Sequence, residues 1–157
     1  MKEKIYLDTS IPSAYFDNRD KNRQKLTQRW WHQNLFKNYE VYISELVEAE
    51  LNDTKDKGKR HVFLELVKGI GNLKITEETM ELAQIYVDEN IIPEEYVDDA
   101  IHLAVATVNG IGTVVSWNFA HMVNHETKRR VKAANILQGY REIEIESPLE
   151  LGGGDCV

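Results

Sequence analysis

Acidic residues stand at the ends of several apolar segments in this chain. Asp8 ends the segment KIYLD, and Glu50 lies near the end of YISELVEAEL. Asp98 and Asp99 open the segment DDAIHLAVA, and Asn118 follows the apolar run TVVSW. Carboxylates that are brought together at the ends of core elements repel one another unless a cation lies between them. Their positions therefore predict a site for a hard metal ion.

The other metal-binding residue types narrow the choice of ion. Cys156 is the only cysteine, which excludes an internal disulfide and a zinc site built from cysteines. The five histidines are not spaced as in HExxH or a similar short zinc motif. A site built from oxygen ligands favours Mg²⁺ or Mn²⁺.

Composition indicates an ordinary globular protein. The chain has 157 residues, of which 42% are hydrophobic and 29% charged, and this length fits one domain with a real core. No apolar run reaches the roughly 18–20 residues of a membrane span, and MKEKIYLD does not fit a signal peptide. We therefore expect a cytoplasmic protein with no membrane association. The net charge of −7 speaks against a general nucleic-acid coat but is compatible with a nuclease that has an acidic centre.

Short strand-like runs alternate with helix-like segments along the whole chain. The expected strands are residues 4–7, 41–43, 72–75, 112–116 and 141–145. The main expected helices cover residues 19–37, 61–70, 76–89, 93–109 and 126–139, with short ones after Ser10 and Ser44. This alternation predicts an α/β fold in three α/β/α layers, with a central parallel sheet of about four to five strands. Residues 1–146 are expected to form a single domain, and residues 147–157 a flexible tail.

The fold class brings the polar residues together. In open α/β sheets, sites form at the carboxyl ends of strands, and Asp8 and Asn118 both follow strands. Asp98 and Asp99 stand at a helix start, where the helix dipole favours negative charge. Adjacent helical residues point about 100° apart, so only one of the two is expected to be a direct ligand. We assign that role to Asp99 and an auxiliary or water-mediated role to Asp98.

The remaining polar residues have competing interpretations. Glu50 is expected to point inward, whereas Glu45 and Glu48 fit surface positions. His102 is interpreted as a packed core residue, because it stands alone in an apolar helix. His121 lies near Asn118 in the sequence, and it is therefore a candidate for contact with a phosphate at the site.

Four short motifs occur in an informative order: DTS near the N-terminus, a central AEL, then DDAIHLAVA, then SWNFAHM. Together they resemble the PIN-domain family, whose bacterial members include the VapC-like ribonuclease toxins of type II toxin–antitoxin pairs. The resemblance spans residues 4–145 and implies a PIN-like fold. It also implies that a homodimer forms and that an antitoxin protein binds it.

The resemblance assigns catalytic positions to Asp8, Glu50, Asp99 and Asn118. Asp8, Asp99 and Glu50 would hold metal, with Asp98 in support. Asn118 stands where many members carry a fourth aspartate, with Ser116 two residues before it. The amide removes one formal charge, which should weaken a second metal ion more than the first.

The implied activity is hydrolysis of RNA phosphodiester bonds with Mg²⁺ or Mn²⁺ as cofactor. The alternative is a non-catalytic PIN-fold module that binds RNA or protein through a weakened metal site. A phosphatase of the haloacid type is disfavoured, because Ser10 occupies the place of its second aspartate.

Overall fold

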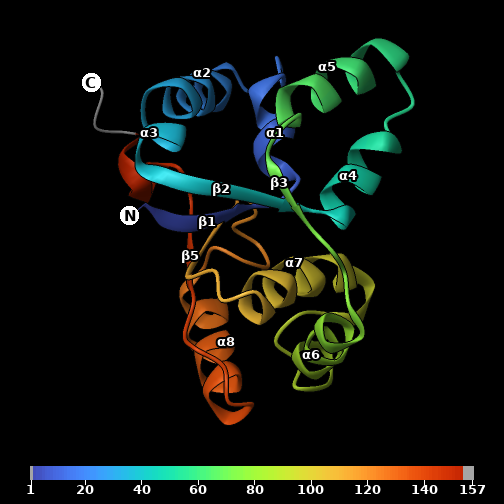
Figure 1. The fold of residues 1–157 in the computed structure, drawn as a ribbon, viewed down its shortest axis with the longest axis vertical. Helices are drawn as coiled ribbons and strands as arrows, with labels where there is room; N and C mark the ends of the chain where they lie inside the picture. The colour runs from blue at the N-terminus through green and yellow to red at the C-terminus, as the bar shows by residue number, and fades with distance from the viewer. Residues whose placement is uncertain (1, 154–157) are drawn as a thin grey trace.

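Five parallel strands form one central sheet in the computed structural model, which describes residues 2–153. Their order across the sheet is β3-β2-β1-β4-β5 (Figure 1). The strands are β1 (Glu3–Leu7), β2 (Tyr39–Ser44), β3 (Gly71–Leu73), β4 (Thr113–Val115) and β5 (Glu144–Glu146). All four pairings are parallel, which confirms the predicted α/β class.

Helices cover both faces of the sheet (Figure 1). The upper layer in this view consists of α1 (Ser10–Tyr15), α2 (Lys21–Trp30), the π-helical turn η1 (Trp31–Leu35), α3 (Phe36–Asn38), α4 (Glu45–Asn52) and α5 (Lys57–Val67). The lower layer consists of α6 (Glu77–Asp88), α7 (Val97–Val108) and α8 (His125–Leu137). The 3-10 helix η2 (Glu94–Tyr96) leads into α7, and the turn η3 (Leu149–Gly153) follows β5. The predicted three-layer arrangement is confirmed.

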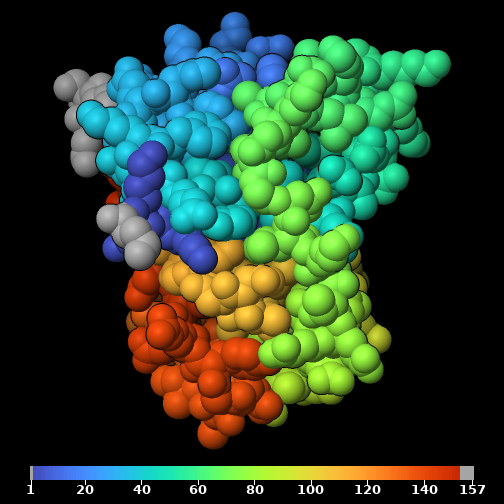
Figure 2. Space-filling view, viewed as in Figure 1, coloured from blue at the N-terminus to red at the C-terminus, as the bar shows by residue number. Residues whose placement is uncertain are grey.

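The change of layer follows from the strand order. The chain lays down β1, β2 and β3 in one direction, then returns to the other side of β1 to place β4 and β5. Because crossovers between parallel strands are right-handed, this reversal puts the later helices on the opposite face. The space-filling view shows the segments from α1 to α5 in the upper half of the molecule and those from α6 to α8 in the lower half (Figure 2).

The core explains why the central elements are so apolar. In β1, Ile5, Tyr6 and Leu7 are fully buried, as expected of a strand covered on both faces. Helix α7 buries every residue from Ala100 to Thr107, so it lies inside the lower layer rather than on its surface. None of the helices among residues 2–153 is long and apolar enough to span a membrane.

Several predicted elements have different bounds in the structure, and two of them differ most. The helix expected over residues 19–37 is divided into α2, η1 and α3. The helix expected from residue 61 begins earlier, at Lys57, because the Asp56 side chain accepts a hydrogen bond from Lys59 N and caps it. Within the expected tail, Ser147 is buried and its N–H donates to Glu150 Oε2 at 2.6 Å. Residues 154–157 lie outside the described residues.

Candidate active site

The site forms where the order of strand addition reverses, between β1 and β4. We call this point the strand reversal. β1 and β4 pair side by side, with Leu7 opposite Val115, and the chain leaves them toward different layers. Asp8 directly follows β1, and its N–H donates to Val115 O at 3.2 Å. Asn118 follows β4. A crevice at the carboxyl ends of such a pair is where open α/β sheets bind their ligands.

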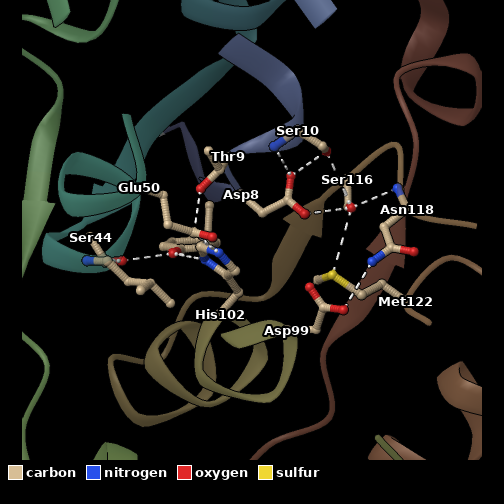
Figure 3. A network of polar contacts seen from close by, with 12 residues as sticks. Asp8, Thr9, Ser10, Ser44, Glu50, Asp99, His102, Ser116, Asn118 and Met122 are labelled. Carbon is tan, nitrogen blue, oxygen red and sulfur yellow. Dashed lines mark hydrogen bonds and ion pairs between the residues drawn. The ribbon is translucent and has the colours of Figure 1, made fainter. Parts of the chain in front are cut away.

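Asp8 is buried and held by hydroxyl groups (Figure 3). Its Oδ1 accepts hydrogen bonds from Ser10 N at 3.1 Å and Ser10 Oγ at 2.5 Å. Its Oδ2 accepts one from Ser116 Oγ at 2.6 Å. Burial raises the pKa of Asp8, and the charge of Asp99 adds to the rise, although His102 and the two hydroxyls oppose it. The protein alone therefore does not fully compensate a negative charge on the Asp8 carboxylate.

Ser10 begins α1, but its hydroxyl does not cap the helix. Neither Thr9 nor Ser10 makes a side-chain cap for this helix. Ser10 Oγ accepts a hydrogen bond from Trp117 N at 2.8 Å while it donates to Asp8. Its hydroxyl thus ties the loop after β1 to the loop after β4.

Asp99 and Asn118 meet across the crevice. Asp99 lies in the first turn of α7, and its Oδ2 accepts a hydrogen bond from Asn118 Nδ2 at 3.0 Å. Asn118 Oδ1 accepts one from His121 N at 3.0 Å, which fixes the orientation of the amide. His121 Nδ1 also lies 3.3 Å from Asp99 Oδ2. Burial raises the pKa of Asp99, against the opposing effects of His102, His121 and Asn118.

Glu50 reaches the same region from the end of α4. Its Oε1 accepts hydrogen bonds from Thr9 Oγ1 at 2.6 Å and from His102 Nε2 at 2.7 Å. Burial acts to raise the pKa of Glu50, but the hydrogen bond and charge of His102 outweigh it, so the pKa is lowered. Glu50 is consequently ionised at neutral pH.

His102 has a larger part than the sequence suggested. It is buried, as predicted, but its two ring nitrogens are both engaged: Nε2 with Glu50, and Nδ1 with Tyr6 Oη at 2.7 Å. Tyr6 Oη is in turn 2.8 Å from Ser44 Oγ. Burial acts to lower the pKa of His102, but Glu50 and the nearby aspartates outweigh it and raise the pKa. The one available signal was a polar residue inside an apolar helix, which must find a partner.

Asp98 is not brought into this network. It is exposed on the first turn of α7, whereas Asp99 beside it is partly buried. The difference follows from the 100° rotation between neighbouring helical residues.

The donor chemistry fits a hard cation, but the ligands are not collected around one point. Asp8 and Asp99 are oxygen donors whose pKa values are raised by burial, and a divalent ion would relieve their repulsion. Within residues 2–153, however, no three His, Cys, Asp or Glu side chains lie close enough together to hold a metal ion. Glu50 is bonded to His102 and Thr9.

Two hollows border the loop after β4. One, of about 200 Å³, is lined by residues including Ser10, Arg23, Trp117 and Asn118. Here the Arg23 guanidinium stacks 4.8 Å from the Trp117 ring centre. The second hollow, of about 430 Å³, has His121 in its wall. Both hollows therefore include residues bonded to the carboxylates.

Comparison with known proteins is consistent with this geometry. The family model described as PIN domain matches residues 5–118. No curated protein sequence matches the chain.

Several solved structures share the fold. VapC20 of Mycobacterium tuberculosis, a toxin that cleaves the sarcin–ricin loop, aligns with a TM-score of 0.59 at 19% identity over 90% of this chain and 99% of that chain. The VapBC2 structure from Rickettsia felis, bound to a promoter DNA fragment, gives 0.55 at 15% identity over 91% and 98%. VapBC-1 from nontypeable Haemophilus influenzae gives 0.55 at 14% identity over 92% and 97%. At these identities the likeness is one of fold.

Proposed function

This chain belongs to the PIN-domain family, as its motifs predicted, and we propose that it is an endoribonuclease that uses Mg²⁺ or Mn²⁺. The observation that carries the proposal is the pair of carboxylates at the strand reversal. Asp8 and Asp99 come from different layers, and burial raises the pKa of each. An arrangement that costs stability in this way is typical of a functional site.

Asp8 and Asp99 would hold the ion, with Glu50 beside them. A bound divalent ion lowers the pKa of a water molecule and neutralises charge that develops on the phosphate. The residues around the carboxylates would fix their positions. Ser10 and Ser116 hold both oxygens of Asp8. Oδ1 accepts two hydrogen bonds from Ser10, whereas Oδ2 accepts only the one from Ser116 and keeps a lone pair for a metal.

Glu50 and Asn118 would act beside the ligands. Because His102 lowers the pKa of Glu50, this carboxylate stays ionised and can accept a hydrogen bond from the attacking water. Asn118 donates to Asp99 through Nδ2 and would hold that carboxylate in place. A ligand role for Asn118 Oδ1 stays a prediction, since that oxygen accepts from His121 N.

RNA is the proposed substrate, and an antitoxin protein is the proposed partner of a homodimer. VapC20 is a toxin that cleaves the sarcin–ricin loop, and the structural neighbours include VapBC structures. A cytoplasmic location agrees with these roles and is part of the same proposal.

RNA cleavage tests the proposal directly. We expect the protein to cut a labelled RNA in Mn²⁺ and to stop when the metal is chelated. Asp8→Asn and Asp99→Asn should each lower the rate roughly a hundredfold or more. Glu95→Gln is the matched control, because it removes an exposed carboxylate near the same helix. Full Mn²⁺-dependent cleavage by both aspartate variants would contradict the proposal.

The variant Asp98→Asn distinguishes the role of Asp98 in RNA cleavage from that of Asp99. Asp98 is exposed and outside the network, so we expect its variant to keep most of the activity. A loss as large as that of Asp99→Asn would instead support the auxiliary ligand role that the sequence predicted.

Two observations favour a second candidate, a non-catalytic PIN module. The described residues lack a ready group of three ligands, and Asn118 stands where the family resemblance implies an acid. Calorimetric titration with Mn²⁺ distinguishes the two functions. Binding together with RNA cleavage supports the nuclease, whereas RNA binding without metal binding or cleavage supports the module.

A further inference from the structure

An exposed aromatic ring stands beside the candidate active site. Tyr96 ends the 3-10 helix η2, which leads directly into α7 and Asp99. The residue is 45% exposed, and its hydroxyl makes no hydrogen bond to any residue in the described range 2–153. Its ring forms a tilted stack with the His121 imidazole, with centroids 4.0 Å apart and planes at 35°. The histidine thus supports one side of the tyrosine, which stays partly exposed to solvent.

The supporting histidine is tied to the site. His121 Nδ1 lies 3.3 Å from Asp99 Oδ2, and His121 N donates to Asn118 Oδ1 at 3.0 Å. The Tyr96 ring is therefore one side chain away from a carboxylate that we propose as a metal ligand. A ligand that places a phosphate at Asp99 would bring its neighbouring groups near Tyr96.

The other exposed aromatic residues are situated differently. Phe119 is 42% exposed, but it meets Trp117 edge-on and lies 5.8 Å from the Arg23 guanidinium. Phe36 is 44% exposed and contacts Trp31 edge-on, next to the amino end of β2 at the opposite edge of the sheet. Among the described residues, Tyr96 alone combines an exposed ring with a stacked partner that touches a site carboxylate.

The charges around Tyr96 indicate what kind of contact it can make. Glu94, Glu95 and Asp98 are exposed within the same stretch of chain, so this surface repels phosphate. Arg130 lines the adjacent hollow, but its guanidinium donates to Glu89 O and to Asn90 O. Attraction for a nucleic acid must therefore come from the ring face. Stacking of a base on an aromatic ring needs no charge and accepts any base.

We propose that Tyr96, supported by His121, is a stacking platform for a nucleobase of single-stranded RNA whose backbone lies at the Asp8–Asp99 site. This inference rests on the proposed ribonuclease function and adds to it a position that binds an unpaired base. A base inside a duplex has both faces covered by its neighbours, so the platform favours unpaired RNA.

Binding of a short fluorescein-labelled oligoadenylate, followed by anisotropy, tests the platform. Tyr96→Leu should weaken binding about tenfold, within the range for loss of one stacked base. Tyr96→Trp should restore it, because the indole also stacks. Phe36→Leu is the matched control and should bind within about twofold of the wild type, since it removes an equally exposed ring far from the site. Thermal unfolding of each variant checks that the fold is kept.

A second reading distinguishes stacking from a structural effect. An oligoadenylate with one 2-aminopurine should lose fluorescence when the wild type binds it, and Tyr96→Leu should remove this quenching. Replacing the same nucleotide by an abasic one should weaken binding to the wild type but add little to the effect of Tyr96→Leu. Additive losses, or unchanged quenching in the variant, would overturn the platform.

The two proposals fail in different ways. If the wild type cleaves RNA and Tyr96→Leu binds oligoadenylate as tightly as the wild type, the stacking proposal is wrong and the nuclease proposal is kept. If the wild type neither binds nor cleaves RNA, the nuclease is wrong and the platform falls with it.

Discussion

Two polar networks, one partly buried and one fully buried, lie at opposite ends of helix α7. At its start lies the acidic network, made of Asp8, Ser10, Glu50, Asp99, His102, Ser116 and Asn118. At its end lies the neutral network, made of Tyr86 from α6, Thr107 from α7 and Asn135 from α8. The first contains three carboxylates, and the second contains only hydroxyls and one amide.

The difference separates a stabilising network from a functional one. In the neutral network, Asn135 accepts from Tyr86 Oη and donates to Thr107 Oγ1 at 3.2 Å. All three side chains are buried and bonded to one another, which stabilises a fold. In the acidic network, Asp8 and Asp99 keep raised pKa values despite their hydrogen bonds. His102 compensates these carboxylates only in part, and a bound cation would supply the remaining positive charge.

The largest change in stability is expected in the neutral network. Asn135→Ala removes the partner of Tyr86 and Thr107 and leaves buried polar groups unpaired. We expect the free energy of unfolding to fall by about 1–3 kcal/mol, measured by urea denaturation. RNA cleavage at low temperature should not change. Gln138→Ala, an exposed change just after the same helix, should stay within about 0.5 kcal/mol of the wild type. A loss of cleavage by folded Asn135→Ala would break the distinction.

A smaller change is expected when the acidic network gains a charge. Asn118→Asp replaces the donor to Asp99 Oδ2 by a second anion, so the metal-free protein should lose about 1 kcal/mol of stability. Added Mn²⁺ should then raise the melting temperature more than it does in the wild type. Asn118→Ala is the control, since it removes the same hydrogen bond without adding a ligand. An equal response of all three proteins to Mn²⁺ would show that residue 118 does not contact the cation.

The smallest expected change is in how the free energy of unfolding of the metal-free protein depends on pH. The pKa of Asp99 is raised on folding, from a usual value of 3.8, chiefly by burial. The folded state therefore binds the proton more tightly, and this contribution to stability is present below pH 3.8 and is lost as the pH rises through the folded pKa. Asp99→Asn should consequently become more stable relative to the wild type as the pH rises from about 3.5 to 8. A constant difference, measured by urea denaturation across this range, would contradict the raised pKa.

Tyr86→Phe supplies the comparison from the neutral network. Burial raises the pKa of Tyr86 well above its usual range, so the hydroxyl does not titrate over the same pH values. The stability difference between this variant and the wild type should stay constant with pH.

Sequence reasoning succeeded where the chain itself carries the information. Strand ends are visible as apolar runs that stop, and parallel strands share one carboxyl edge, so the proximity of Asp8 to Asn118 could be predicted. Helix rotation predicted that only one of Asp98 and Asp99 would point inward, and the structure shows Asp99 partly buried and Asp98 exposed.

Contacts between side chains from distant elements were not predictable. The bond between His102 and Glu50 joins residues 52 positions apart and depends on how α4 and α7 meet. The bond of Thr9 to Glu50 spans 41 positions. A hydroxyl at the start of a helix is expected to cap that helix when only the local sequence is considered. Tertiary packing places a carboxylate beside the Thr9 hydroxyl, which donates to that carboxylate instead. The stack of Tyr96 on His121 depends on packing in the same way.

The place of β1 between β2 and β4 has a consequence for protein synthesis. Ser116 donates to Asp8 across 108 positions, and no part of the chain made earlier can supply this contact. A nascent chain that has not yet released β4 from the ribosome can pair β1 with β2, but it lacks one wall of the crevice. If the chain cuts RNA, as we propose, this delay means that it cannot act until β4 and Ser116 have left the ribosome.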